Sequence, residues 1–594
     1  MRTYGGTSRS PVPPTDDIGH GTDVAMCAAG VQNTGPFGTI MGVAPKAFLG
    51  SYKVFATSSG ASTDAIIEAL DDAVSDGMDV LNLSLGSTIA QRTQDDPLVS
   101  AVENAFTAGA LVTISAGNSG PDPNTMASPG TAPDAITVGS MSNERVFSGA
   151  LTIAGGDPVM AIPGSGPNPS TPLSAPVIDV ASVDPTGLAC GSFPAGSLNG
   201  SIALILRGSC FFESKLDNVA QAGAVAALIY AAASSPQAIA MDVGAATLPA
   251  AMISNQDGMA LKQQLANGSP TASIDFSQKP FWAQFQNVSS FSGVGPNVDN
   301  GIKPDLLAVG DPISTASPMA HDGSANDGYS IKSGTSFSSP IVAGAAALLK
   351  AARPGLTPAQ YRSLLVNSGA SFDSPAPVAK TGGGYLNVAA ALQNTITAAP
   401  TSLSYGIGSG TVNQSLTVTL TNLGTSDDTF ALSVTPTDGT AAPALSSTTL
   451  PVAAGQSQTV TLQFNAGSLT AGVYDGYVQV QGSQTSVITN IPYWYGVASG
   501  VAAQVTPLDP PQTGTGGSQQ AIVFRVTDLI GSAVMQTPTI SVSSGNGKFV
   551  GVSSIDSIIP GAFEAVVRLG SSGTTNVFHI VSGSVSADVT IASQ

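Results

Sequence analysis

Hydrophobic periodicity changes along this chain, and the changes limit the architectures that it can adopt. Up to about residue 150, amphipathic helical segments alternate with short runs that are apolar throughout, such as "MDVLNLSLG" and "ALVTISAGN". Strands buried on both faces are typical of a parallel sheet covered by helices, so this part predicts an α/β domain. Beyond about residue 396, apolar and polar residues alternate at period two between Gly, Asn and Ser turns. That pattern predicts two β-sandwiches.

The α/β pattern is interrupted and then resumes. The interruption holds Pro-rich turns, the strand "SIALILRG" and the helix "KLDNVAQAGAVAALIY", and the later part ends in the apolar helix "SSPIVAGAAALLKAARPG". One domain is therefore expected to be inserted into another. The predicted organisation is a first α/β part at 1–150, an insert at 151–285, a second α/β part at 286–395, and sandwiches at 396–499 and 500–594.

The stretch "STDAIIEALDDAVSDG" carries the helical signal most clearly. Ser62 or Thr63 is the expected N-cap, and Gly77 is the expected stop. Apolar residues at helical spacing share one face, which predicts the side packed on the sheet; they are Ile66, Ile67, Leu70, Ala73 and Val74.

Composition excludes several classes of protein. Charged residues make up only 10% of the chain and the net charge is −19, which argues against nucleic-acid binding because basic patches supply most of that affinity. No run of about 18 apolar residues predicts a membrane span, and the opening segment has no apolar core of a signal peptide. Three cysteines in a chain of this length exclude a disulfide scaffold.

Three separate stretches carry candidate chemistry. His20 lies in "DDIGHGTDVAMCAAG", and a histidine acting as a general base needs a nucleophile to deprotonate and an acid to orient it. Ser336, in "SGTSFSSPIVAG", lies at a glycine turn on a helix N-terminus, where a hydroxyl and a backbone amide face the same atom. Asn118, in "SAGNSGP", leaves a buried strand and can donate to an oxyanion. Taken singly, Ser336 is more often a helix cap and Asn118 a turn residue.

Together, "GHGTDVA", "SAGNSG" and "GTSFSSPIVAG" resemble the motifs of the subtilase family of serine proteases, in the family's order. The resemblance also includes "GVAPKAFLGSYKVF", "NLSLG" and "ASPGTAPDAITVGS", and covers most of 1–150 and 286–395. It implies a subtilisin-like three-layer fold with a parallel sheet. It also implies a secreted serine endopeptidase that forms an acyl-enzyme, with His20 as general base, Ser336 as nucleophile and Asn118 as oxyanion donor. A monomer that acts on polypeptides and needs no cofactor is expected.

The resemblance further implies where a peptide substrate binds. The backbone of Ser84, Leu85 and Gly86 would pair with an extended substrate strand. The other side of the cleft would be lined by Ser115, Ala116 and Gly117. The stretch "NLSLG" is equally explained as the plain end of a buried strand.

The insert, from "CGSFPAGSLNG" to "AVAALIY", resembles an α+β protease-associated domain. Cys190 and Cys210 flank its strand, and a disulfide between them is as well supported as two free thiols. Arg207 and Lys215 are expected to be solvated charges. The two C-terminal modules resemble fibronectin-III-like (396–499) and immunoglobulin-like (500–594) sandwiches.

The triad aspartate is the missing element. In the family it lies on a sheet strand several tens of residues before the histidine, whereas only 19 residues precede His20. Asp16, Asp17 and Asp23 flank His20 too closely to reach the far side of its ring. We therefore expect an N-terminally incomplete version of a longer protein with a signal peptide, a propeptide and the Asp strand. The alternative is a catalytically impaired relative that binds peptides or surfaces.

The remaining candidates have plainer explanations. Cys27 is expected to be a small buried hydrophobe rather than a metal ligand. Neither His321 nor His579 has a partner at metal-ligand spacing. Subtilases often bind calcium, so a structural calcium ion is compatible with the resemblance. The stretch "HDGSANDG" lacks EF-hand spacing and is expected to be a solvated loop, which leaves the metal site unknown.

Overall fold

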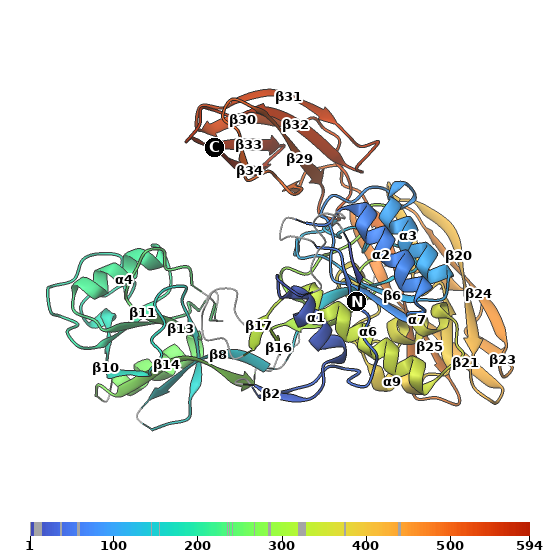
Figure 1. The fold of residues 1–594 in the computed structure, drawn as a ribbon, viewed down its shortest axis with the longest axis horizontal. Coiled ribbons are helices and arrows are strands. Elements are labelled where there is room, and N and C mark those ends of the chain that lie inside the picture. The colour runs from blue at the N-terminus through green and yellow to red at the C-terminus, as the bar shows by residue number, and fades with distance from the viewer. Residues whose placement is uncertain are drawn as a thin grey trace. The chain divides into compact units, whose positions relative to one another are not determined.

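In the computed structural model the chain folds into two compact units (Figure 1). The first consists of Met1–Asn143 together with Phe285–Gln594, and the second of Glu144–Gln284. The insert thus begins at residue 144, because the strand Arg145–Ile153 belongs to it. The structure describes residues 2–4, 15–35, 38–55, 60–143, 145–153, 155–233, 236, 238–239, 241–266, 268–282, 287–318, 328–372, 376–437 and 441–594.

A four-stranded parallel sheet in the order β15-β7-β6-β5 forms the centre of the α/β part. Its strands are β5 (Val80–Leu83), β6 (Leu111–Ser115), β7 (Ile136–Ser142) and β15 (Leu306–Asp311). The helices are α1 (His20–Ala29), α2 (Thr63–Ser75), α3 (Pro97–Thr107), α6 (Thr335–Ala352), α7 (Pro358–Asn367), α8 (Val378–Thr381) and α9 (Val388–Gln393), with a 3₁₀ turn η1 at Thr93–Asp95.

The sheet is covered on both faces, as its apolar strands predict. Val112 and Ile114 of β6 pack in one cluster with α2 and α3, whereas Leu111 packs with α6 and α7 in another. This alternation is the period-two geometry of a strand buried on both sides. Helix α2 matches the prediction, because the Ser62 side chain accepts a hydrogen bond from the Ala65 amide at its start.

Short strand pairs form separate two-stranded sheets in the same unit. They are β1 (Arg2–Thr3) with β4 (Tyr52–Lys53), β2 (Asn33–Gly35) with β3 (Gly38–Ile40), and β16 (Ile313–Ala316) with β17 (Tyr329–Lys332). β1 is only two residues long, and neither of them is buried. Tyr4, directly after β1, is buried in the same cluster as α2, and its hydroxyl donates to Asp72 at 2.8 Å.

The insert is a closed barrel with two helices. The barrel order is β10-β11-β12-β13-β9-β8-β14. Its elements are β8 (Arg145–Ile153), β9 (Val159–Pro163), β10 (Leu173–Asp179), a 3₁₀ turn η2 (Val180–Ser182), β11 (Ile202–Leu206), α4 (Phe212–Gln221), β12 (Ala226–Tyr230), β13 (Ala250–Ile253), α5 (Asn255–Leu265) and β14 (Thr271–Trp282).

Cys190 and Cys210 form a disulfide in the insert, with 5.8 Å between their Cα atoms. The expectation of a solvated Lys215 is wrong. Its side chain is buried on α4 and donates to the carbonyl oxygens of Leu188 and Leu206. Burial lowers the pKa of Lys215 to about 8.

Two sandwiches follow the α/β part. The first consists of β18 (Ile396–Ala399), β19 (Leu403–Gly408), β20 (Val412–Asn422), β21 (Asp428–Pro436), β22 (Ala444–Leu445), β23 (Thr449–Val452), β24 (Ser457–Ala466), β25 (Gly472–Gly482) and β26 (Ile488–Val497). Its sheets are β18-β20-β24-β22 and β19-β26-β25-β21-β23, and their inner faces share one apolar cluster.

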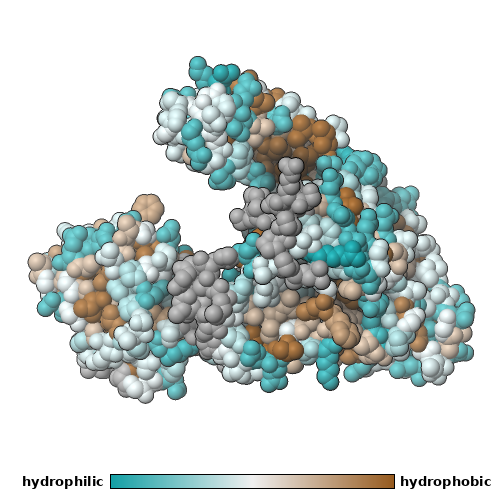
Figure 2. All heavy atoms as spheres, viewed as in Figure 1, coloured by the Kyte–Doolittle hydropathy of each residue, from teal (hydrophilic) through white to brown (hydrophobic). Residues whose placement is uncertain are grey.

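The second sandwich pairs the sheets β27-β29-β32-β31 and β28-β34-β33-β30. Its strands are β27 (Gln504–Pro507), β28 (Thr513–Gly514), β29 (Gln519–Thr527), β30 (Thr539–Ser544), β31 (Lys548–Ser554), β32 (Ala562–Arg568), β33 (Thr575–Ser582) and β34 (Val585–Ser593). Apolar surface is visible on this module in Figure 2, and its exposed large apolar side chains include Leu529, Val550 and Ile558.

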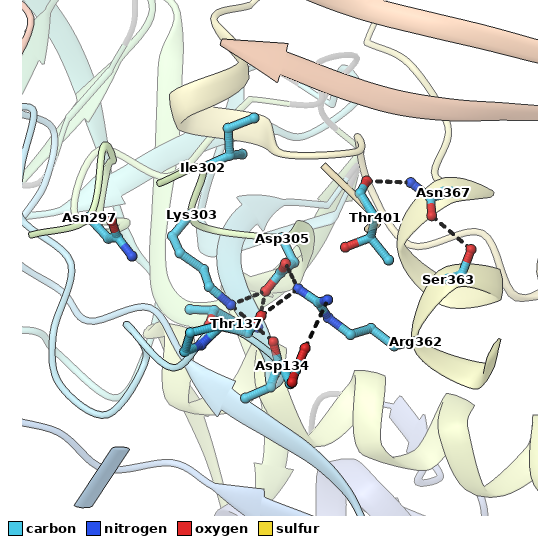
Figure 3. A network of polar contacts seen from close by, with 12 residues as sticks. Asp134, Thr137, Asn297, Ile302, Lys303, Asp305, Arg362, Ser363, Asn367 and Thr401 are labelled. Atoms are coloured by element: carbon cyan, nitrogen blue, oxygen red, sulfur yellow. Dashed lines mark hydrogen bonds and ion pairs between the residues drawn. The ribbon is translucent and has the colours of Figure 1, made fainter. Parts of the chain in front are cut away.

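A buried polar network joins the segment directly before β15 to β7 and α7 (Figure 3). The Asp305 carboxylate accepts hydrogen bonds from the Thr137 amide at 2.7 Å, from Lys303 at 2.7 Å and from Arg362 at 2.8 Å. One turn further along α7, Asn367 donates to the carbonyl oxygens of Thr401 and Asn490, each at 2.8 Å. These bonds tie the α/β part to the first sandwich.

Candidate active site

The N-terminus of α6 brings two of the predicted motifs together. Ser336 is the second residue of α6. The Asn118 side-chain oxygen accepts hydrogen bonds from the Thr335 amide at 3.0 Å and the Thr335 hydroxyl at 2.9 Å. This fixes the orientation of the Asn118 amide group. Its nitrogen has no partner in the described part of the chain and is left to donate beside Ser336.

His20 reaches the same helix end from α1, of which it is the first residue. Its ring centroid lies 5.9 Å from that of Phe337, the residue after Ser336. Burial lowers the pKa of His20, with Lys332 acting in the same direction and Asp16 opposing it. The imidazole is therefore predominantly neutral at neutral pH, as a general base must be.

A hydrogen-bond network that the sequence analysis missed holds the start of α6 against β5. The Asn82 side-chain oxygen accepts from the Ser339 hydroxyl at 2.7 Å, and the Asn82 amide donates to the Ser84 hydroxyl at 3.0 Å. Ser84 in turn donates to the carbonyl oxygen of Ser336 at 2.7 Å. The available signal was the polar Asn82 inside the otherwise apolar strand "VLNL".

Only one side of the predicted substrate cleft offers free main chain. For Ser84, Leu85 and Gly86, no backbone partner is found among the described residues, and Gly86 is exposed. On the opposite side, the Ala116 amide donates to Val138 and the Ala116 carbonyl accepts from Ala127.

The neighbours of Ala116 are held similarly. Ser115 lies in β6 and pairs with β7, and the Gly117 carbonyl accepts from the Gly293 amide at 2.9 Å. The segment Ser115–Gly117 can therefore line a cleft but has little main chain left with which to pair.

The carboxylates close to His20 in sequence are engaged elsewhere. Asp16 accepts hydrogen bonds from the Gly19 and Thr22 amides, each at 2.8 Å, and so caps the start of α1. Asp17 forms an ion pair with Lys53 at 2.7 Å. In the described part of the chain, no carboxylate is hydrogen-bonded to the His20 ring.

Asp23 is a buried carboxylate with an incomplete set of partners. Its Oδ1 has no hydrogen-bond partner among the described residues, and Lys332 lies 4.0 Å from Oδ2. Burial raises the pKa of Asp23 to about 6.

An apolar cavity of about 330 Å³ lies beside β5, which pairs with a neighbour, β6, on one side only in the described sheet. Residues of α1, α2, β5 and α6 line it, including Val24, Leu70, Leu83 and Ala343. Phe48, also in the lining, is fully exposed. Its mostly apolar lining suits an extended apolar segment.

The other candidates lie apart from this site. Cys27 is buried, and burial raises the pKa of its thiol to about 12, which makes it a poor nucleophile. His579 lies on β33 with Asp588 at 2.7 Å. His321 and the stretch 321–327 fall outside the described residues. Among the described residues, no group of three or more His, Cys, Asp or Glu is placed to hold a metal ion, and no helix is long and apolar enough to cross a membrane.

Comparison with known proteins agrees with these motifs. The model of the subtilase family, Peptidase S8, matches residues 4–410. The minor extracellular protease Vpr of Bacillus subtilis (strain 168) is 30% identical over 488 residues, which cover 79% of this chain and 58% of Vpr. The subtilisin-like protease SBT1.6 of Arabidopsis thaliana is 32% identical over 379 residues, which cover 60% of this chain and 49% of that protein.

A solved structure, the psychrophilic subtilisin-like protease Apa1 from the Antarctic psychrotroph Pseudoalteromonas sp. AS-11, superposes with a TM-score of 0.40 at 18% identity, covering 66% of this chain and 87% of Apa1. The chain spans about half the length of the curated relatives it matches. Because the family model covers more than half of the chain, this protein belongs to the subtilase family.

Proposed function

We propose that this chain is the peptide-hydrolysing part of a secreted serine endopeptidase, with Ser336 as nucleophile, His20 as general base and Asn118 as oxyanion donor. The observation that carries the proposal is that two motifs contact the start of α6. The Asn118 side chain accepts hydrogen bonds from Thr335, and the His20 ring lies against Phe337. The extracellular relative Vpr supports a site of action outside the cell.

In the proposed reaction, the Ser336 hydroxyl oxygen bonds to the carbonyl carbon of a peptide while its proton passes to His20. The oxyanion is held by the Asn118 amide and by the backbone N–H of Ser336 at the start of α6, where the first amides of a helix have no partner within the helix. Collapse breaks the C–N bond, and the leaving amine takes the proton from His20. Water then attacks the Ser336 ester by the same proton route, so no cofactor is needed.

An orienting carboxylate for His20 is the remaining requirement. We propose that it arrives on an extended apolar segment that lies in the cavity along β5. The apolar lining and the single pairing partner of β5 support this assignment. A strand there would fill the cavity and satisfy the backbone groups of a buried edge.

An extended polypeptide is the proposed substrate. No backbone partner of Ser84–Gly86 is found among the described residues, which supports binding by strand addition, in which backbone bonds give affinity and side-chain pockets give preference.

A fluorophosphonate probe tests the chemistry directly. We expect slow labelling of the wild-type chain, located on Ser336 by peptide mass spectrometry, and none in Ser336→Ala. Because burial lowers the pKa of His20, the labelling rate should rise with pH through a midpoint below about 6.5. Peptide binding without any labelling of Ser336 would instead favour the alternative of a non-catalytic peptide-binding protein.

A further inference from the structure

The loop that follows Asn118 is held at its tip by the second sandwich. This loop runs from Asn118 to Ala127, and the Ala127 amide returns to the Ala116 carbonyl at 3.1 Å. At the tip, Arg525 of β29 donates to the carbonyl oxygen and to the side-chain oxygen of Asn124, each at 2.9 Å. The Asn124 side-chain amide donates to the Gly531 carbonyl at 3.0 Å.

Close backbone contact accompanies these bonds. Gly531 has φ 82°, a left-handed conformation that favours glycine, and a Cβ there would lie 3.1 Å from Pro123 and 3.2 Å from Asn124. Asn124 itself has φ 61°, a conformation that asparagine tolerates better than most residues. The loop tip therefore fits the module with little space between them.

The loop on the other side of the cleft meets the same module. It follows Ser84–Gly86, and its Ile89 packs against Leu508, Ile559 and Ala562 of the second sandwich. The two loops are also joined to each other, because Ser87 and Ser128 exchange backbone hydrogen bonds at 2.9 and 3.0 Å. One module thus contacts both segments that border the candidate cleft.

The burial of Arg525 argues that it is kept for these bonds rather than for stability. Arg525 is 2% exposed, and no ion pair is found for it among the described residues. Its Nη2 has no hydrogen-bond partner there either. A buried cation without a carboxylate is unfavourable compared with an apolar side chain of the same size. The other nitrogens of the Arg525 guanidinium donate hydrogen bonds: Nη1 donates to Asn124, and Nε donates to the Pro560 carbonyl oxygen.

We propose that the second sandwich is part of the active-site architecture, and that Arg525 is a positioning residue which holds the loop carrying Asn118. This proposal rests on the proposed function, since the loop matters because Asn118 is to bind the oxyanion. The module fixes both borders of the cleft, and Arg525 acts through Asn124 without touching substrate.

The test compares Arg525→Met with Arg568→Gln, an exposed arginine at the end of β32 in the same module. Asn124→Gly is the second variant, because it removes the side-chain bonds and keeps the left-handed backbone accessible. Each protein is examined by hydrogen exchange of segment 117–127, by the rate of fluorophosphonate labelling of Ser336, and by urea unfolding.

For Arg525→Met and Asn124→Gly we expect faster hydrogen exchange in 117–127 and unchanged exchange in β33 and β34. Labelling of Ser336 should slow by about tenfold to a hundredfold, because misplacing a catalytic group by about 1 Å has an effect of this size. Arg568→Gln should match the wild type in all three measurements. Combining Asn124→Gly with Arg525→Met should slow labelling little more than either change alone, because both remove the same contact.

The proposal is overturned if exchange in 117–127 stays at the wild-type level in both variants, or if it rises only together with exchange throughout the module. Wild-type protein that is not labelled at all would reject the proposed function instead. In that case the exchange measurement alone would still decide whether Arg525 holds the loop.

Discussion

Arg362 and Arg525 are both buried, at 8% and 2% exposure, but their surroundings differ in charge. Arg362 lies 2.8 Å from the Asp305 carboxylate, which Lys303 also contacts at 2.7 Å. Arg525 donates to backbone carbonyl oxygens and one amide oxygen, with no carboxylate partner among the described residues. The buried arginine of the α/β part thus has a carboxylate as counter-ion, whereas the buried arginine of the second sandwich has only neutral oxygen partners among the described residues.

The difference separates two uses of a buried charge. In the Asp305 cluster, two cations and one anion are desolvated together, so removing the anion leaves Lys303 without its carboxylate and Arg362 with only the exposed Asp134. Around Arg525 the desolvation is already unfavourable, and what the guanidinium provides is a fixed position for Asn124. Stability should therefore depend on the first cluster, and the geometry of the candidate site on the second.

The largest effect is expected for Asp305→Ala. This change leaves Lys303 and Arg362 buried without their carboxylate, and breaking such a pair lowers the free energy of unfolding by about 3–5 kcal/mol. Urea denaturation measures it. Asp134→Ala is the matched control, because Asp134 is 53% exposed and lies 3.9 Å from Arg362, and about 0–1 kcal/mol is expected for it. Equal losses in the two variants would contradict a special role for Asp305.

The free energies of unfolding of Arg362→Met and Arg525→Met, measured by urea denaturation, compare the two buried arginines directly. Arg362→Met should lose stability toward the low end of about 3–5 kcal/mol, since Lys303 still faces Asp305. Arg525→Met should change the free energy of unfolding by less than about 1 kcal/mol, or increase it, because an apolar side chain replaces a buried cation for which no counter-ion is found among the described residues. Loss of stability in Arg525→Met as large as in Arg362→Met would show that both arginines serve the fold.

Sequence periodicity was sufficient for the features that repeat locally. It predicted α2, with Ser62 or Thr63 as its cap, and the strands β5 and β6. The motif resemblance named His20, Asn118 and Ser336 as site residues. In the structure, His20 lies against Phe337 and Asn118 bonds to Thr335, the two neighbours of Ser336. These features depend on neighbours a few residues apart or on a motif of fixed spacing.

Contacts between distant segments were not predictable in this way. Asn124 and Arg525 are far apart in sequence, and each is individually unremarkable as a turn residue and a strand residue. Lys215 has the appearance of a solvated helix charge until the fold places the Leu188 and Leu206 carbonyls around it. A single chain carries no periodic signal for such pairs, because the partner is chosen by packing and not by spacing.

Asp23 is a buried carboxylate with an incomplete set of partners, as Arg525 is a buried cation with one. It should make the free energy of unfolding depend on pH. Its pKa is raised by burial from 3.8 to about 6, so between about pH 4 and 6 the unfolded chain releases this proton while the folded chain keeps it. The contribution of Asp23 to stability should therefore fall as pH rises through this window. We expect Asp23→Asn to be more stable than wild type at pH 7 and to differ less at pH 4. Asp79→Asn, at a carboxylate whose side chain is 77% exposed, is the control.

The smallest effect is expected for a His–Asp pair that is left in solvent. His579 and Asp588 lie 2.7 Å apart on β33 and β34, but their side chains are 37% and 57% exposed. Water already stabilises both groups, so Asp588→Asn should change the free energy of unfolding by about 0–1 kcal/mol, and added salt should reduce that difference further. Urea denaturation at low and high salt measures it. A loss comparable to that of Asp305→Ala would mean that burial does not decide the strength of these charge pairs, and the contrast between Arg362 and Arg525 would need another cause.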